Sequence, residues 1–414
     1  MDNLTHTLAG VLIGETVSRL APQDRAGLPP PQRRDLLVAL SAVCSNLPDA
    51  DLLYTFAAGT KLGYLSQHRG YTHTIVGIAL AAALAILVVE LVMRWRGQRP
   101  ARQDHGAILA AAGLSVAVHL VLDFTNNYGV HPFWPVDNRW IYGDAVFIIE
   151  PLLWVCAAPL LFLQRTFIAR GLLAAVLIAA VALSFGTRWM LPASGAGLSV
   201  LLASLLYAGW KGSARTALTC AAGAWLAVTA MFFVAGGLAG DRIAREVAGR
   251  HPGASLLDRV LSPMPANPLC WNVIVVTLEA DRYALRRAVV SVGPAVLAAR
   301  DCPDRTLDEA ATAPMRPIAA QPGAAVRWLD EYVVGKAEFP RIVQAYCEAA
   351  VFMHFARAPW LASRDGRWIV GDLRYDREPQ LGFAEVELAE PSRACSVARP
   401  PWIEPRRDVL APAR

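Results

Sequence analysis

The chain has 414 residues, of which 55% are hydrophobic, and its formal net charge is +5. Its mean hydropathy of +0.36 is too high for an ordinary soluble enzyme of this length, so the composition predicts a membrane protein. Basic and acidic residues nearly balance in the less apolar C-terminal part, so we expect no nucleic acid among its partners.

The first residues, MDNLTHTLAG, differ from a secretory signal peptide because they open with an acid instead of lysine or arginine. We expect residues 4–20 to form a short retained helix of about 25 Å. Longer apolar blocks follow, each near the roughly 20 residues that cross a bilayer as a helix. They occupy residues 74–93, 107–124, 145–164, 167–187 and 216–237, with a shorter block at 197–210.

These blocks and the two N-terminal stretches predict an all-α polytopic membrane domain over residues 1–240, with about eight membrane-embedded helices. Buried core helices of a soluble protein are the alternative. Basic residues favour alternate loops by about twelve to four, the bias typical of cytoplasmic loops. We therefore place residues 21–35, 94–106, 165–170 and 211–215 in the cytoplasm. The N-terminus, the alternate loops and everything after residue 238 then lie outside.

Residues 241–414 carry charges throughout and predict a smaller extracytoplasmic α+β domain. Residues 271–292 and 366–388 each have the pattern of a strand pair, whereas 325–334 and 340–360 have a helical pattern. Four cysteines fall in this part, and two disulfides or four buried free thiols explain them equally well. They are Cys270, Cys302, Cys347 and Cys395.

With this topology, the histidines and acids of the apolar half gather at its outer end. Five of its six histidines are outer, and His105 is the exception. His119 and Asp123 are four residues apart, which places them on one helix face. The other outer candidates are His6, Asp49, Asp51, His68 and His73. Ionisable groups inside membrane spans are costly, so such a set points to function.

Imidazole nitrogens and carboxylate oxygens without a thiolate suit zinc or another first-row divalent ion. The candidates outnumber the ligands of one tetrahedral ion, so two or more ions are expected. Clustered ions favour phosphoester hydrolysis.

Each residue also has a simpler interpretation. His6 would be an interfacial histidine, His68 a loop residue and His73 a helix-start residue. His119 and Asp123 would form a hydrogen-bonded pair or a proton relay, and Asp49 would be a helix cap after Pro48. Asp51 would orient a ligand, Asp144 would cap the span at 145, and residues 131–135 would anchor the chain at the interface.

The motifs MDNLTHTLAG, NLPDAD, HRGYTHT and HLVLDFTNNYGVHPFWP resemble the YdjM-like family of bacterial inner-membrane metal-dependent hydrolases over residues 1–160. That family is similar in motif order to zinc-dependent phospholipase C and P1-type nucleases, helical enzymes with three zinc ions. The resemblance implies phosphoester substrates, with His73 and Asp51 near the metal. It implies as ligands His6, Asp49, His68, His119 and Asp123. Glu150 departs from the family pattern, in which an aspartate is expected.

The predicted function is metal-dependent hydrolysis of a phospholipid or other amphipathic phosphoester at the outer membrane–water interface. Asp51 or His73 would act as base or orienting group, and Arg69 would hold a phosphate oxygen. The C-terminal domain would gate substrate access or bind a protein partner. An ion or proton transport protein and a membrane scaffold with a structural metal site are the alternatives.

Overall fold

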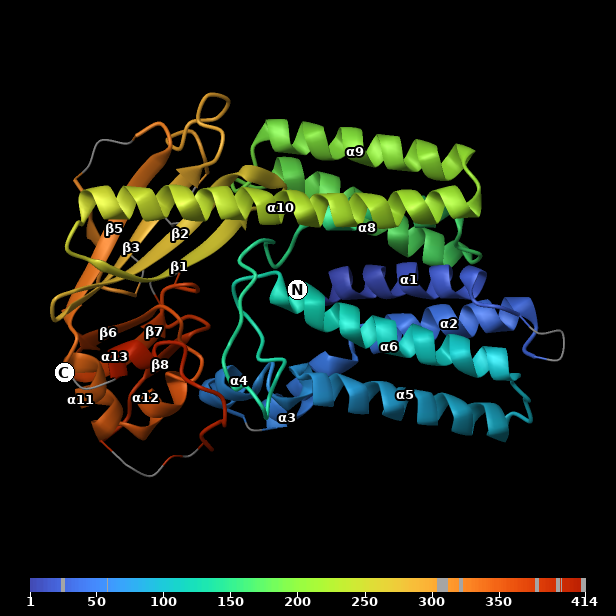
Figure 1. The fold of residues 1–414 in the computed structure, drawn as a ribbon, viewed down its shortest axis with the longest axis horizontal. Coiled ribbons are helices and arrows are strands. Elements are labelled where there is room, and N and C mark those ends of the chain that lie inside the picture. The colour runs from blue at the N-terminus through green and yellow to red at the C-terminus, as the bar shows by residue number, and fades with distance from the viewer. Residues whose placement is uncertain are drawn as a thin grey trace.

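The computed structural model describes residues 1–23, 27–57, 59–303, 312–319, 323–376, 380–391, 395 and 397–410. A helical half and a sheet-containing domain lie end to end along the long axis of the molecule (Figure 1). The longer helices of the first half are α1 (Asn3–Leu20), α2 (Pro30–Cys44), α5 (Ile75–Trp95), α6 (Arg102–Phe124), α8 (Phe167–Gly186), α9 (Pro192–Lys211) and α10 (Ala214–Arg250). Shorter pieces are η1 (Leu47–Ala50), α3 (Asp51–Ala57), α4 (Lys61–Gln67), η2 (Tyr71–His73), α7 (Pro151–Cys156) and η3 (Ala158–Phe162).

Five of the described helices are long and apolar enough to cross a membrane: α5, α6, α8, α9 and α10. A sixth span results if α2 and residues 47–55, bent by 54° at their junction, count together. A multi-pass helical region is therefore confirmed, but eight membrane-embedded helices are not. The apolar block 145–164 yields only a short helix at 151–162, because Pro151 starts it and Pro159 interrupts regular α-helical hydrogen bonding.

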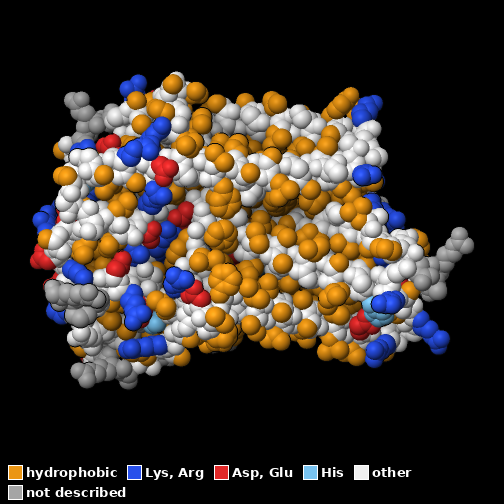
Figure 2. Space-filling view, viewed as in Figure 1, with side chains coloured by type: hydrophobic (Ala, Val, Ile, Leu, Met, Phe, Trp, Pro, Cys, Tyr) orange, Lys and Arg blue, Asp and Glu red, His pale blue; other side chains and the backbone are white. Residues whose placement is uncertain are grey.

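The connections between α5 and α6 and between α9 and α10, both flanked by basic residues, lie at the end remote from the sheet-containing domain (Figure 1). Figure 2 shows a hydrophobic band between two ends that carry the charged side chains. At the remote end, buried ion pairs join helices: Arg33 Nε lies 2.9 Å from Asp104 Oδ1, and Arg34 pairs with Glu15. Glu15 is thus paired with arginines on the side where a transport path would have to continue.

The C-terminal part contains a five-stranded antiparallel sheet in the order β1-β2-β3-β5-β4 and a three-stranded sheet in the order β6-β7-β8. The first sheet comprises β1 (Ser255–Met264), β2 (Asn267–Glu279), β3 (Arg282–Ser291), β4 (Arg316–Pro317) and β5 (Val326–Gly335). The second comprises β6 (Pro359–Arg364), β7 (Arg367–Asp372) and β8 (Glu385–Glu387), accompanied by α11 (Glu338–Ala345), α12 (Cys347–Phe352) and α13 (Arg407–Leu410).

The predicted strand pair at 271–292 is confirmed as β2 and β3, and β7 and β8 fall within 366–388. The helix predicted at 325–334 is wrong, because this segment forms β5. Its buried residues include Val326, Trp328 and Tyr332, which are β-branched or aromatic and lie an even number of positions apart. A register shift opposite Arg287 and Ala288 divides them between the two faces of the sheet, so Val326 and Trp328 pack in one core and Tyr332 in the other.

Helix α10 joins the two parts, since it continues through residue 240 and lies against β1, β2 and β3 (Figure 1). Gly236 permits this approach: a Cβ there would lie 3.1 Å from the Trp271 ring of β2. Four cysteines of the sheet-containing part form two disulfides, Cys270–Cys302 and Cys347–Cys395.

Candidate metal centre

The break between α2 and α3 carries two of the candidate acids. Pro48 lies in the first turn of η1, so the chain bends there, with Asp49 on η1 and Asp51 at the start of α3. His119 and Asp123 lie one turn apart on α6, and His73 ends η2 just before Thr74 caps α5. Three separate segments therefore deliver side chains to the end of the helical half that adjoins the sheet-containing domain (Figure 1).

Four ligand atoms converge there. His73 Nε2 lies 3.3 Å from Asp49 Oδ1 and 3.1 Å from Asp123 Oδ2. His119 Nε2 lies 3.7 Å from Asp49 Oδ1, 3.5 Å from Asp123 Oδ2 and 3.1 Å from His73 Nε2. Both imidazoles are fully buried. These four residues form one group of side chains able to hold a metal ion.

The separations between these atoms match a tetrahedral ion site. Ligands about 2.0–2.1 Å from a zinc ion at tetrahedral angles lie about 3.3–3.4 Å from one another. Five of the six separations are those given above, and they range from 3.1 to 3.7 Å. The arrangement therefore has the size and the nitrogen and oxygen donors that a small divalent cation requires.

Hydrogen bonds behind the ligands fix their orientation. His119 Nδ1 donates to the Ser45 carbonyl at 2.7 Å, which leaves Nε2 with its lone pair directed toward the cluster. His73 Nδ1 lies 3.0 Å from Thr72 Oγ1 and 3.5 Å from Asp51 Oδ2. A carbonyl or carboxylate behind a histidine is the usual support of metal-binding imidazoles.

The two oxygens of Asp123 face different neighbours. Oδ2 faces His73 and His119, whereas Oδ1 accepts from Arg69 Nη2 at 2.8 Å and contacts the Met1 amino group. Arg69 Nη1 also donates to carbonyls of Asp123 and Gly129, and only 3% of the residue is exposed. Arg69 thus neutralises and holds a carboxylate of the cluster. The prediction that Arg69 binds a phosphate oxygen did not anticipate this contact.

A second group lies beside the first and shares one member with it. Asp49, Asp51 and His68 also bring ligand atoms within metal-binding range of one another. His68 Nδ1 lies 3.2 Å from Asp51 Oδ1, and Asp51 Oδ2 accepts from the backbone N–H of Arg69 at 2.9 Å. Burial lowers the pKa of His68, which favours the neutral imidazole that a metal or a proton acceptor needs.

His6 lies next to these groups without being a member of either. Its ring stacks on His119 with 3.9 Å between centroids, and its Nε2 lies 3.3 Å from Asp123 Oδ1. His73, in contrast, lies in the first group, although the sequence analysis gave it a catalytic role. All eight predicted site residues are thus gathered in one region, with His6, Asp51, His68 and Arg69 around the four-atom cluster.

A cavity of about 500 Å³ opens onto the centre. Asp49, His68 and Arg69 form its polar wall. The other walls are mostly apolar or aromatic and come from distant parts of the chain: Leu52, Tyr64, Tyr128, Ile148, Ile149, Tyr375 and Phe383, together with Met1, Asp2 and Asn3. Tyr375 and Phe383 belong to the C-terminal part, and no motif in the sequence indicated that they would reach this cavity.

Two residues that the sequence analysis singled out have other roles. Glu150 caps α7 at Leu152 N and accepts from Ala266 N at 3.0 Å, so it links the helical half to the turn between β1 and β2. His131 is buried between Trp140 and Trp402, and burial lowers its pKa to about 3. This stack attaches Trp402, in the last segment of the chain, to the connection of residues 125–150 between α6 and α7 (the outer loop).

Residues 1–218 match the family described as YdjM inner membrane protein. The uncharacterized protein YfhP of Bacillus subtilis is 23% identical over 155 residues, which cover 37% of this chain and 43% of YfhP. The matched part thus spans less than half of that relative. No solved structure matches the chain. The family resemblance of the N-terminal motifs is confirmed, whereas the similarity to zinc-dependent phospholipase C and P1-type nucleases stays a prediction.

Proposed function

The chain belongs to the YdjM inner membrane protein family, and from this premise and its metal centre we propose that it is a membrane-bound metal-dependent hydrolase. Its substrate is a phosphoester such as a phospholipid, taken at the outer face of the inner membrane. The observation that carries the proposal is the set of four buried ligand atoms with tetrahedral spacing beside a partly apolar cavity.

Asp49, His73, His119 and Asp123 would hold one divalent ion, zinc by the donor set, and Asp49, Asp51 and His68 a second. Ions at these positions would lower the pKa of water and withdraw charge from a phosphoryl oxygen. Because Asp49 belongs to both groups, it fixes their separation.

The chain's own side chains supply the remaining chemistry. His68 faces the cavity and has Asp51 behind its Nδ1, so its Nε2 is placed to take or give a proton when the second group holds no ion. Arg69 holds Asp123 so that Oδ2 stays turned toward the two imidazoles. The aromatic walls exclude water from part of the cavity, which strengthens the electrostatic interactions inside it.

Metal content tests the proposal directly. In protein purified in detergent without chelator, we expect stoichiometric divalent metal by mass spectrometry and hydrolysis of a phosphodiester. His119→Ala combined with Asp123→Ala should remove the metal of the four-atom group and abolish the hydrolysis. His105→Ala is the matched control, since His105 lies at the opposite end with nearly half of its side chain exposed.

Wild-type protein that contains no stoichiometric metal would sink the proposal and favour a transport role. Metal that is bound tightly while every phosphodiester is left intact would instead identify a scaffold with a structural site. The two alternatives thus give different results in the same pair of measurements.

The disulfides support an extracytoplasmic C-terminal domain, because such bonds persist mainly in oxidising compartments. The three remaining cysteines, Cys44, Cys156 and Cys220, are free thiols. When whole cells are denatured with a mass-tagged maleimide, we expect three tags before reduction and seven after it. Seven tags without reduction would contradict this location. Cys270→Ser with Cys302→Ser should give three and then five tags.

A further inference from the structure

A second cavity adjoins the one at the metal centre. Its volume is about 420 Å³, and it is lined by Thr55, Gly59, Thr60, Lys61, Tyr64 and Phe383. Tyr64 and Phe383 also line the metal cavity, so these two side chains form the wall between the two spaces. Its surface is largely apolar, and among the described residues it contains no candidate metal ligand.

The shared wall stands directly beside the metal centre. The Tyr64 ring stacks on His68 with 4.9 Å between centroids and meets Phe383 edge to face at 5.5 Å. A molecule with a phosphate at Asp49 and His68 therefore has an apolar space one aromatic ring away. Lys61 Nζ, the one formal charge among the residues lining that space, donates to the carbonyls of Gly382 and Glu385 at 2.6 and 3.2 Å.

Apolar side chains continue from both cavities to the surface. Leu53 is 76% exposed, Ile149 is 43% exposed and Phe383 is 39% exposed. They come from α3, from the loop before α7 and from the segment before β8. These segments lie where the helical half meets the sheet-containing domain (Figure 1). Exposed apolar groups at the edge of a membrane domain are suited to contact with lipid.

We propose that the second cavity binds an acyl chain of the substrate, whose phosphate lies at the metal centre. This inference rests on the proposed function and names its substrate class as acylated phosphoesters. Tyr64 and Phe383 then lie between the phosphate and the acyl chain of the bound molecule. Phe383 lies outside residues 1–218, so the C-terminal domain contributes chain selectivity to the site of the family-matched part.

The test compares phosphatidylcholines that differ only in acyl length with each other and with an acyl-free phosphodiester, in detergent below the level at which the lipids aggregate. The probes are bis(p-nitrophenyl) phosphate, which has no acyl chain, and phosphatidylcholines with chains of four, six and eight carbons. For wild-type protein we expect kcat/KM to rise by up to about fourfold for each methylene that enters the second cavity. Equal rates on all acyl lengths, with the soluble ester also hydrolysed, would overturn this inference and leave the proposed function intact.

Thr55→Phe fills the cavity and should remove the dependence on acyl length while the acyl-free ester is hydrolysed at the wild-type rate. Thr219→Phe is the matched control. Like Thr55, Thr219 donates its hydroxyl to the carbonyl three residues earlier, but it lies at a remote and exposed position. Phe383→Ala opens the wall and should move the preference toward longer chains, which keeps the test valid if Thr55→Phe misfolds. Unchanged chain preference in both folded variants would overturn the inference. Hydrolysis of none of the probes by wild-type protein would overturn the proposed function as well.

Discussion

Replacing Asp49 by asparagine should reduce the bound metal from two ions per chain to less than one, because Asp49 is the member that both ligand groups share. Asparagine keeps the shape and the hydrogen bond from Asn3, which lies 3.0 Å from Asp49 Oδ2, but it removes the negative charge. Losing a hydrogen bond behind a metal ligand typically reduces activity by about 10–100-fold. Losing a charged ligand should reduce the rate of hydrolysis by more than that. Mass spectrometry of the purified variant and a phosphodiester assay measure the two effects.

Two neighbouring substitutions make this result specific. His68→Ala should remove one ion and leave the four-atom group loaded, since His68 belongs only to the second group. Asn46→Ala changes a neighbour that bonds to Thr7, Ala42 and Asn3 but belongs to neither ligand group, and it should retain both ions. An Asp49→Asn protein that still holds two ions would show that the groups are filled independently, and the shared-carboxylate arrangement would then be abandoned.

The sequence contained most of the information about which side chains meet. The spacing of His119 and Asp123 fixes them on one helix face, and the arginine pattern placed the other candidates at the same end. It did not distinguish a ligand from its support. His73 and His68 are five residues apart in one motif, yet η2 turns His73 into the four-atom cluster while His68 faces the cavity. That difference depends on a turn at Arg69 with a φ of 59°, which residue types alone do not reveal.

Sequence patterns could not predict the contribution of the C-terminal part to the cavity for a similar reason. Local periodicity predicted β2 and β3 correctly, but β5 was misread because a register shift opposite Arg287 and Ala288 interrupts its period-two alternation. Tyr375 and Phe383 reach the metal cavity only because the second sheet docks on the outer loop. Docking depends on contacts between segments more than 200 residues apart, such as Arg357 with Asp144.

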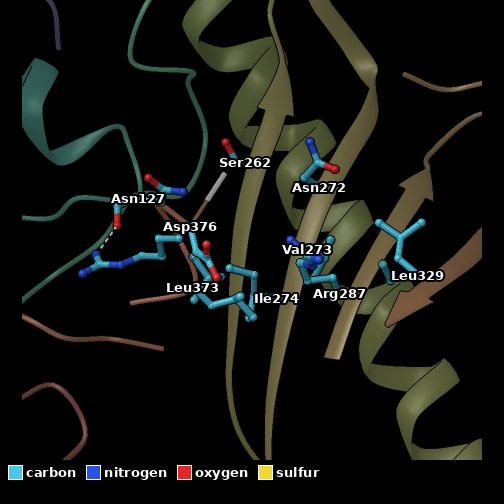
Figure 3. A pocket seen from close by; sticks show the side chains of 12 residues that line it. Asn127, Ser262, Asn272, Val273, Ile274, Arg287, Leu329, Leu373 and Asp376 are labelled. Atoms are coloured by element: carbon cyan, nitrogen blue, oxygen red, sulfur yellow. Dashed lines mark hydrogen bonds between the residues drawn. The ribbon is translucent and has the colours of Figure 1, made fainter. Parts of the chain in front are cut away.

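Around this docked interface, arginines connect the outer loop to the sheets. Arg374 donates to the Asn127 carbonyl at 2.8 Å while its guanidinium is paired with Asp372. Figure 3 shows Asn127 and Asp376 facing Ser262 and Asn272 across a cavity of about 60 Å³, with the hydrogen bond to Asn127 drawn as a dashed line. A space of this size accommodates only a few water molecules, so the interface is closely packed here.

Arg357 contacts acids on both sides of this interface. It binds both oxygens of Asp144 at 2.7 and 2.8 Å and both oxygens of Asp258 at 2.9 and 3.0 Å, and only 5% of its side chain is exposed. Asp144 lies in the outer loop and Asp258 on β1, so one side chain joins the helical half to the first sheet. Burial would raise the pKa of Asp258, but the Arg357 guanidinium holds it below its usual value.

Arg357→Ala should therefore leave the buried Asp144 carboxylate without its cation and Asp258 with only Arg406, 3.7 Å away, and destabilise the docked domain by about 3–5 kcal/mol. Without the guanidinium, burial raises the pKa of both acids in the folded state, so the loss should be largest at neutral pH. It should shrink as the pH falls toward the ordinary carboxyl pKa of about 4, where both groups become protonated and neutral. Thermal unfolding in detergent at pH 5 and pH 7.5 measures this dependence.

The matched control is Arg139→Ala, which removes an exposed arginine paired with Asp137 in the same outer loop and should leave the unfolding temperature unchanged. If Arg357→Ala unfolds like the wild type at neutral pH, the ion pairs do not hold the domain in place. If it unfolds early but keeps its metal and its activity on an acyl-free ester, the metal centre is independent of the docked domain. Loss of the chain-length preference together with the docking would then tie substrate selection to the C-terminal domain, because Tyr375 and Phe383 leave the cavity wall when that domain separates.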